Sequence, residues 1–262
     1  MSDSVLLDVT GGVATVTLNR PEGMNSLTLD AKVALNEAVA AVASDERVRA
    51  LVLTGTGRAV CVGQDLKEHA ALLGAGDPAP LSTVATHYNP LVTALAALPF
   101  PTIAAINGTA AGAGLGIACA LDLRIGAAGA RYTTAFAGIG LTADSGLSWT
   151  LPRLVGTGRA AALLLLAEPF TAEQALDMGI LNVVVAPEQV LEVATELATR
   201  LANGPTTAYA CLKESLAFGA DSTLVDALAK EGALQTRAGQ TQDHHNAVRS
   251  FLAKQPASFT GR

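Results

Sequence analysis

The sequence predicts an α/β core followed by an all-helical C-terminal region. Segments that alternate like strands and segments with the roughly 3.6-residue period of helices succeed one another through most of the chain. From Pro187 onward every periodic segment has the helical period. Gly204 and Pro205 interrupt that helical stretch, so we expect a core over residues 1–203 and a helical region over residues 204–262.

The N-terminal half begins with a predicted strand, Val13–Leu18, in which apolar and small polar residues alternate. Thr28 is placed to cap the helix that follows. The apolar face of this helix comprises Leu35, Ala38, Val39 and Val42. Arg49–Thr54 is predicted to be a second strand, and a later helix carries Leu91 and Leu95 on one face.

Helix signals dominate the last third of the chain. Thr171 and Gln174 have the spacing of a capping box at the start of a helix that Gly179 ends. Ile180–Val185 is strand-like, and two amphipathic helices follow. Their apolar stripes contain Val190, Val193, Ala194 and Leu197, and Leu224, Ala227 and Leu228.

The most informative stretch lies between Pro101 and Pro152. A strand-like run is followed by an Asn-Gly turn, a crowd of glycines and alanines, and a short helix, Ile117–Leu121, that is apolar on every side. Small residues let a ligand approach the backbone closely, and the start of a helix presents unpaired N–H groups. Asp144 stands about twenty residues later among apolar and small neighbours. We therefore expect backbone donors that stabilise an oxyanion beside a carboxylate that moves a proton.

Composition excludes several classes of function. Half of the 262 residues are hydrophobic and 15% are charged, which argues against general disorder. The net charge is −6 without a basic block, so we expect no nucleic-acid partner. The three cysteines, Cys61, Cys119 and Cys211, form neither a disulfide framework nor a metal-ligand spacing. We expect a reduced, cytoplasmic protein without a metal.

The chain shows no membrane signal. Met1–Val5 lacks the basic and hydrophobic regions of a signal peptide. The longest apolar stretches, such as 160–167, fall far short of the roughly 20 residues that span a bilayer. We expect no membrane partner.

Five motifs in a fixed order resemble the crotonase family, also called the enoyl-CoA hydratase/isomerase superfamily, over nearly the whole chain. They are Leu18–Pro21 with Asn25–Leu27, Cys61–Leu66, Pro101–Gly108 through Gly112–Gly114, Asp122–Ile125, and Leu151–Gly156. The resemblance implies a spiral of ββα turns with a helical C-terminal region that assembles trimers or dimers of trimers. It also implies an acyl-CoA thioester as the substrate and no tightly bound cofactor.

The resemblance implies roles for particular residues. The backbone N–H groups of Val62 and Ala113 would form the oxyanion hole for the thioester oxygen. Contacts with the substrate or its CoA would come from Arg20, Met24, Gly63, Gln64, Asp65, Leu66, Ala111, Gly112 and Phe136. Arg20 and Lys67 are the candidates for the CoA phosphates.

The sequence departs from the hydratases of this family at two positions, and this departure argues against efficient hydration. Those enzymes carry two glutamates, and the matching positions here are Gly116 and Phe136, neither of which can move a proton. Asp144 remains as the single acid/base, in a context that resembles the branch of the phenylacetate-pathway epoxyphenylacetyl-CoA isomerase. The chain end Phe251–Arg262 fits the same branch. A single carboxylate suits a double-bond or ring-epoxide isomerisation.

Several alternatives stay open. Asp144 is also well placed to cap a helix beginning at Ser145. Asp144 as nucleophile or water-activating base would give an acyl-CoA hydrolase or dehalogenase, for which His87 is a candidate assistant. Two further hypotheses are that the protein is an enoyl-CoA hydratase of low efficiency or a non-catalytic acyl-CoA-binding subunit.

Overall fold

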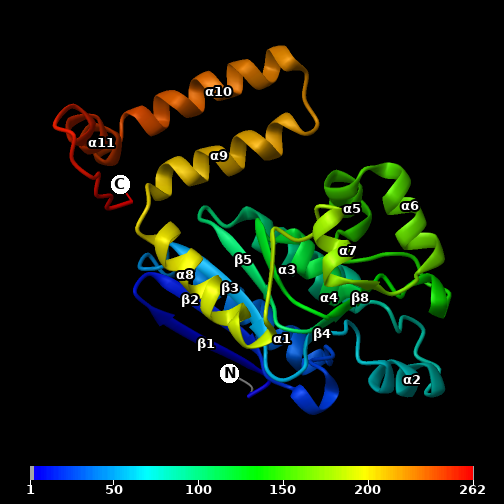
Figure 1. Cartoon of the computed structure of the whole chain (residues 1–262). Coiled ribbons are helices and arrows are strands. Elements are labelled where there is room, and N and C mark those ends of the chain that lie inside the picture. Colours follow the sequence, from blue (N-terminus) through cyan, green and yellow to red (C-terminus); the bar gives the residue numbers. More distant parts are fainter. Residues whose placement is uncertain (1–2, 262) are drawn as a thin grey trace.

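The computed structural model describes residues 3–261, so that Met1, Ser2 and Arg262, which contribute to the predictions for the two chain ends, lie outside the described residues. Two sheets and the helices around them form the core, and three further helices extend away from it (Figure 1). Within the described residues, no helix is long and apolar enough to cross a membrane.

The large sheet has the strand order β1-β2-β3-β5-β7-β10. Its strands are β1 (Val5–Thr10), β2 (Val13–Leu18), β3 (Ala50–Gly55), β5 (Thr102–Ile106), β7 (Leu123–Ala127) and β10 (Val183–Val185). Only β1 runs antiparallel to its neighbour, whereas the other pairs are parallel. Parallel strands need crossover connections, and the helices between them supply these.

The small sheet has the strand order β4-β6-β8-β9. Its strands are β4 (Ala59–Cys61), β6 (Thr109–Ala111), β8 (Arg131–Thr133) and β9 (Phe170–Thr171). In sequence, β3, β5 and β7 each join the large sheet, and the strand that follows each of them joins the small one. The chain therefore winds as a spiral of ββα turns, which the family resemblance implies.

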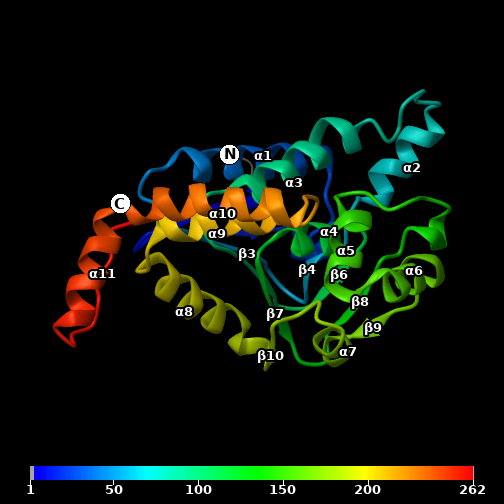
Figure 2. The same cartoon turned by 90° about the horizontal axis from the view of Figure 1, so that it is seen from above.

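Helices fill the turns of the spiral. In the core they are α1 (Leu29–Ser44), α2 (Leu66–Gly74), α3 (Asn89–Ala97), α4 (Ala113–Ala120), α5 (Leu147–Val155), α6 (Thr157–Leu166), α7 (Ala172–Asp177) and α8 (Val190–Ala202). Single turns are η1 (Pro21–Gly23), the π-helical η2 (Val84–Tyr88), η3 (Ala137–Ile139) and η4 (Pro187–Gln189). Figure 2 shows α1 and α8 on opposite faces of the large sheet.

α1 shows how local signals and burial agree. Thr28 accepts a hydrogen bond from the Ala31 amide, which satisfies one of the unpaired donors at the helix start. The predicted face of Leu35, Ala38, Val39 and Val42 is fully buried. Burial of a leucine or valine side chain contributes about 1.5–3 kcal/mol, so this face anchors α1 on the sheet.

The helical arm comprises α9 (Thr206–Gly219), α10 (Leu224–Gly239) and α11 (Gln242–Leu252). It leaves the core at the Asn203–Pro205 turn and lies away from the two sheets in Figure 1, whereas in the view from above α9 and α10 lie over the core and α11 projects to one side (Figure 2). Large apolar side chains remain exposed on it, among them Leu216 at 76%, Leu224 at 75% and Phe251 at 81%. The stripe predicted around Leu224 is thus helical, but no described residue of the chain buries it.

Candidate active site

A cavity of about 110 Å³ lies where the small sheet, α2, η2 and the segment after β8 meet. The sequence-predicted residues that line it are Val62, Gly63, Gln64, Leu66, Gly112, Ala113, Phe136 and Asp144. The other lining residues are His69, Leu81, Val84, Tyr88, Ala135, Ile139 and Leu141. The cavity therefore gathers segments that are more than 80 positions apart in the sequence.

The first half of the site, which we call the amide corner, comprises Val62, Gly63, Gly112 and Ala113. β4 and β6 are parallel neighbours, so their carboxyl ends meet at one edge of the small sheet, and these residues follow directly. A methyl group added to Gly63, whose φ is +82°, would lie 3.1 Å from the Ala113 nitrogen. Only glycine lets the two segments approach this closely.

The two amides of the amide corner have no partner within the described residues. Neither the Val62 nor the Ala113 N–H donates a hydrogen bond to any of residues 3–261. Ala113 is the first residue of α4, where the helix leaves its N–H groups unpaired and its dipole is positive. Both residues line the cavity, so two unpaired donors are available beside the space in which an oxygen atom could acquire negative charge.

The second half of the site, the Asp144 turn (residues 143–146), carries the carboxylate. Ser145 has φ +51° and Gly146 has φ +71°, so the chain reverses sharply before α5 begins at Leu147. Gly146 is the residue that precedes α5, and no side chain caps this helix. The alternative in which Asp144 caps a helix starting at Ser145 is therefore wrong.

The left-handed backbone conformation of Ser145 indicates local strain. A non-glycine residue in this region costs on the order of 1–2 kcal/mol, and Ser145 is held there fully buried. Its hydroxyl donates to Asp144 Oδ1 at 2.9 Å. The turn thus fixes the backbone of Asp144 and binds one of its carboxylate oxygens.

Burial raises the pKa of Asp144, and the Ser145 hydroxyl and the nearby Lys32 charge oppose this rise without cancelling it. Lys32 lies on α1 and is only 1% exposed. Its ammonium group donates to Thr83 Oγ1 at 3.1 Å and lies 5.2 Å from the centre of the Tyr88 ring. Burial lowers the pKa of Lys32. A carboxylate with a raised pKa is suited to take up and return a proton.

The Enoyl-CoA hydratase/isomerase family model matches residues 8–262. The chain belongs to this family. The 1,2-epoxyphenylacetyl-CoA isomerase of Escherichia coli strain K12 is 40% identical over 262 residues, which is 100% of both chains. A Rhodobacter capsulatus protein named as a probable enoyl-CoA hydratase is 40% identical over 260 residues, 99% of this chain and 98% of its own. Both reactions are thus represented among relatives of equal similarity.

The solved structures agree on the fold. A Mycobacterium abscessus protein whose crystal structure is described as that of an enoyl-CoA hydratase/isomerase superposes with a TM-score of 0.96. It is 44% identical, and the match covers 98% of this chain and 100% of that one. The fold of this family member is therefore the mixed α/β fold of the enoyl-CoA hydratases and isomerases.

This family member lacks room for a side chain at position 116. A methyl group on Gly116 would lie 2.9 Å from the Ser145 Cβ and 3.1 Å from the Ser145 carbonyl oxygen. The Asp144 turn therefore occupies the space that a glutamate at position 116 would need. Phe136, at the other position that carries a glutamate in the hydratases, lines the cavity with an apolar ring.

Several predicted substrate contacts lie outside the cavity lining. Asp65 caps α2 and accepts from the Lys67 and Glu68 amides, each at 3.1 Å. It also pairs with Arg20 at 3.4 Å and accepts from the Ser26 hydroxyl at 2.8 Å. Arg20 and Asp65 thus hold the first motif against the start of α2, next to the amide corner.

Met24, Ala111, Lys67 and His87 also do not line the cavity. The Ala111 carbonyl oxygen lies against Gly63, 3.1 Å from the methyl group that would be added there. His87 Nδ1 lies 2.8 Å from the Thr86 hydroxyl. A contact of Met24 with CoA stays a prediction.

Two polar residues that line the cavity, Tyr88 and His69, were not singled out by chemical reasoning on the sequence. Tyr88 is buried and donates to Gln64 Oε1 at 3.0 Å. The Lys32 ammonium group, which is not part of the cavity lining, lies over the face of this ring. His69 has a buried Nδ1 without a hydrogen-bond partner among residues 3–261. Leu66 and His69 are one turn apart on α2 and share a face, so this spacing was the available signal.

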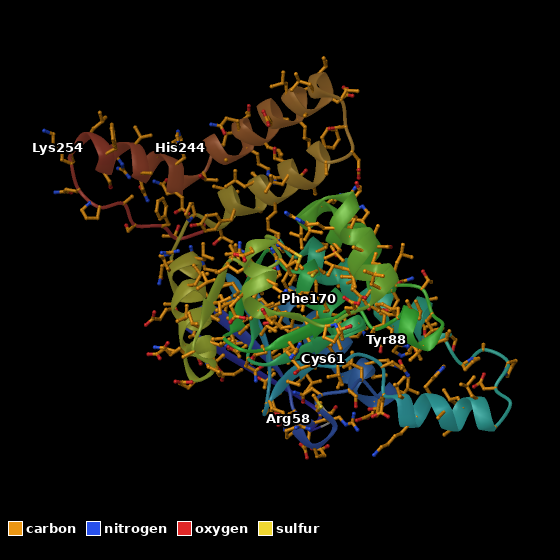
Figure 3. All side chains as sticks on the ribbon, turned by 45° about the vertical axis from the view of Figure 1, so that its right-hand side comes forward. Arg58, Cys61, Tyr88, Phe170, His244 and Lys254 are labelled. Carbon is orange, nitrogen blue, oxygen red and sulfur yellow. The ribbon has the colours of Figure 1, made fainter. Side chains whose placement is uncertain are left out.

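Cys61 lies directly before the Val62 donor. Its side chain is buried, and burial raises the pKa of the thiol to about 12. The Gly63 amide donates to its sulfur at 3.4 Å. Figure 3 shows Cys61 and Tyr88 inside the core, whereas His244 and Lys254 lie on the helical arm.

Among residues 3–261, no group of three or more His, Cys, Asp or Glu side chains is arranged to hold a metal ion.

Proposed function

We propose that this family member is an enoyl-CoA isomerase that moves a double bond, or opens a ring epoxide, through a thioester enolate with Asp144 as its single acid/base. The observation that carries this proposal is the cavity itself. Among the described residues that line it, Asp144 is the only carboxylate, and it faces the same small space as the Val62 and Ala113 amides. A CoA thioester enters as substrate, and no tightly bound cofactor is needed.

The proposed reaction has two proton transfers. The ionised Asp144 takes a proton from the carbon next to the thioester, and the electrons of that C–H bond enter an enolate conjugated with the double bond. The Val62 and Ala113 amides stabilise the negative oxygen. The neutral Asp144 then returns the proton two carbons away, and the double bond is left in its new position. The raised pKa of Asp144 suits it for both steps.

Hydration demands more than this site offers. Adding water to a double bond needs one group to activate water and another to protonate carbon. The hydratases of this family carry glutamates at the positions that match Gly116 and Phe136. The Asp144 turn leaves no room for a side chain at position 116, and the Phe136 side chain is apolar. We therefore favour isomerisation over hydration, although relatives of equal similarity carry both names.

The test compares the wild type with Asp144→Asn on 3-enoyl-CoA and 2-enoyl-CoA esters. We expect the wild type to convert the 3-enoyl ester into the conjugated 2-enoyl ester, seen as a rise in ultraviolet absorbance, and to hydrate the 2-enoyl ester far more slowly. Asp144→Asn is expected to lose about 10²- to 10⁴-fold in kcat. Calorimetry should show that the variant still binds the ester.

Isotope exchange separates this route from the alternatives. In D₂O, the wild type should place deuterium at the exchanging carbons of the ester, and Asp144→Asn should not. Thioester hydrolysis through Asp144 would instead release free CoA and place solvent oxygen in the product acid, and dehalogenation would release halide and place solvent oxygen at the carbon that carried it. If both the wild type and Asp144→Asn bind the ester with equal affinity and neither exchanges, isomerises nor hydrolyses it, the remaining interpretation is a non-catalytic binding subunit.

We further propose that the helical arm assembles a homotrimer or a dimer of trimers in the cytoplasm. The support is the set of exposed apolar side chains on α9–α11. Light scattering on the purified protein tests this assembly. Replacing Leu216 and Phe251 by glutamate should lower the measured mass toward one chain, whereas a monomeric wild type would refute the proposal.

A further inference from the structure

We propose that the buried ammonium group of Lys32 is the counter-charge of the active site, and that Lys32 is a positioning residue that acts on Asp144 through its charge without touching the substrate. The inference rests on the proposed function in that Asp144 moves the proton. It goes beyond that function because it assigns a role to a side chain that lies outside the cavity lining.

Lys32 belongs to the buried face of α1. Lys32, Leu35 and Val39 have the i, i+3, i+7 spacing of one helix face, and all three are at most 1% exposed. A charged group leaves water at a large cost unless partners compensate for the loss. Among residues 3–261, no carboxylate oxygen lies within 4.0 Å of the Lys32 nitrogen. Its partners are therefore not those of a direct ion pair.

Two groups contact the ammonium directly. It donates to Thr83 Oγ1 at 3.1 Å and lies 5.2 Å from the centre of the Tyr88 ring. A cation over an aromatic face is attracted by the negative face of the ring. Tyr88 lines the cavity and Lys32 does not, so the charge lies over a ring that belongs to the cavity wall.

Three acids act on Lys32 through space, namely Glu68, Asp144 and Asp65. Two of them already have other partners. The Glu68 carboxylate accepts from the first amide of α1 at 3.0 Å. Asp65 caps α2 and pairs with Arg20. Among residues 3–261, Asp144 has no cation within 4.0 Å.

Asp144 depends on Lys32 for positive charge. The Ser145 hydroxyl is the one hydrogen-bond donor that its side chain meets among the described residues, and Lys32 is the cation whose charge lowers its pKa. Before proton transfer the negative charge lies on Asp144, and afterwards it lies on the enolate, so the site holds one negative charge throughout. A fixed cation beside an apolar cavity interacts with that charge more strongly than it would in water.

The other titratable groups on the surrounding elements do not supply this charge. Burial raises the pKa of Cys61, Tyr88 and Cys119, so these three side chains are neutral at pH 7. His69 of α2 and His87 of η2 are the histidines on these elements. Both stay in place in every variant below, so they contribute equally to each profile.

The first experiment compares pH–rate profiles of the wild type, Lys32→Met and Lys32→Gln. Methionine is unbranched and fills similar space, and an apolar residue in place of a buried charge is often tolerated by the fold. Glutamine carries no charge but offers a donor to Thr83. Without the cation the pKa of Asp144 rises, so both variants should have the midpoint displaced upward. We expect a loss of about 10-fold in kcat below the midpoint that shrinks as pH rises.

Asn36→Leu is the matched control. Asn36 lies one turn further along α1, and its side chain donates to the His87 carbonyl at 3.3 Å, so it also ties α1 to η2 but carries no charge. Its variant should keep the wild-type midpoint. An unchanged midpoint in the Lys32 variants, or an equal displacement in Asn36→Leu, would overturn the proposal. Unfolding of both Lys32 variants would overturn it too, because the residue would then be structural.

The second experiment needs no turnover. A double-mutant cycle measures chemical unfolding of the wild type, Lys32→Met, Asp144→Asn and the double variant at pH 7. Lys32→Met should be more destabilising, or less stabilising, when Asp144 is present than when it is replaced, and this difference should disappear in acid as Asp144 is protonated. Additive effects at pH 7 would refute the charge coupling. Because the cycle is independent of activity, failure of the isomerase proposal is distinguishable from failure of this one.

Discussion

The two halves of the active site are built in opposite ways. The amide corner offers backbone atoms, and its geometry depends on strand ends and on glycines that let two segments touch. The Asp144 turn offers a side chain on a strained reversal, beside a hydroxyl and a buried ammonium group. The donors of the amide corner are lost only when a substitution displaces the backbone, whereas the carboxylate of the Asp144 turn is lost when its own side chain is replaced.

This contrast separates what the family shares from what decides the reaction. A backbone donor survives almost any side-chain change, so the same oxyanion hole can serve hydration and isomerisation alike. The proton-moving group is a replaceable side chain. Substitutions in the amide corner and in the Asp144 turn should therefore impair the enzyme in different ways. The following predictions run from the largest expected effect to the smallest.

Gly114→Ala should abolish the amide corner altogether. A methyl group here would overlap the carbonyl of Cys61, and backbone atoms cannot yield as a flexible side chain can. We expect destabilisation at or above the upper end of about 1–3 kcal/mol, with loss of turnover. Thermal unfolding measures it. Gly158→Ala in α6, where a methyl group meets nothing within 4 Å, is the control that should unfold at or slightly above the wild-type temperature.

Gly63→Ala should keep the fold and remove the hole. Its methyl group would lie 3.1 Å from the Ala113 nitrogen, at a φ of +82° that alanine resists. We expect a loss of about 10²- to 10³-fold in kcat. The midpoint of the pH–rate profile should stay where it is, because Asp144 is untouched. A shift of that midpoint would show that the two halves are not independent.

Gly116→Ala probes the contact between α4, which begins in the amide corner, and the Asp144 turn. Its methyl group would lie 2.9 Å from the Ser145 Cβ, so the Asp144 turn must move by a few tenths of an ångström. We expect a loss of about 10-fold in kcat, since small misplacements of a reacting group are costly. Rates close to those of the wild type would mean that the turn adjusts freely. Gly138→Ala, with open space around its added methyl group, is the matched control.

Ser145→Gly tests the electrostatics of the Asp144 turn alone. Glycine accepts a positive φ but loses the hydroxyl that donates to Asp144. That hydrogen bond lowers the pKa of Asp144, so the variant should have a still higher pKa. Turnover depends on the ionised form and should rise with pH, with its midpoint displaced upward in the variant and a few-fold loss at low pH. A pH–rate profile measures both.

The smallest expected effect concerns stability. Burial raises the pKa of Asp144 above its ordinary value, so the folded protein holds this proton more tightly than the unfolded chain does. The contribution of Asp144 to stability is full below its unfolded pKa and is lost as pH rises through the folded pKa. Asp144→Asn should therefore melt at or above the wild-type temperature at neutral pH, and the difference should vanish in acid. A lower melting temperature of the variant at neutral pH would contradict this sign.

The sequence predicted the elements that carry strong local signals. Thr28 caps α1, Thr171 and Gln174 form the capping box of α7, and the strands near Val13 and Thr102 lie where alternation or apolar runs indicated them. Strands of two or three residues, such as β4 and β9, are too short to show a period, so the small sheet escaped detection.

The candidate site could be predicted from the sequence only where a local motif marks it. Family motifs pointed to Val62, Ala113 and Asp144, and all of them line one cavity. His69 and Tyr88 were not predicted to line the cavity, because their positions there depend on tertiary packing against segments distant in the sequence. The exclusion of a glutamate at position 116 also needs the structure, since the obstacle is Ser145, far along the chain.

The burial of Cys61 has a consequence for the substrate that we propose. Unsaturated thioesters are electrophiles that add to thiolates, and this sulfur sits one residue from the amide that would hold their carbonyl oxygen. With its pKa raised to about 12, the thiol keeps its proton at neutral pH and is a poor nucleophile. The protein can thus bind an unsaturated thioester next to Cys61 in every catalytic cycle without alkylation of this thiol.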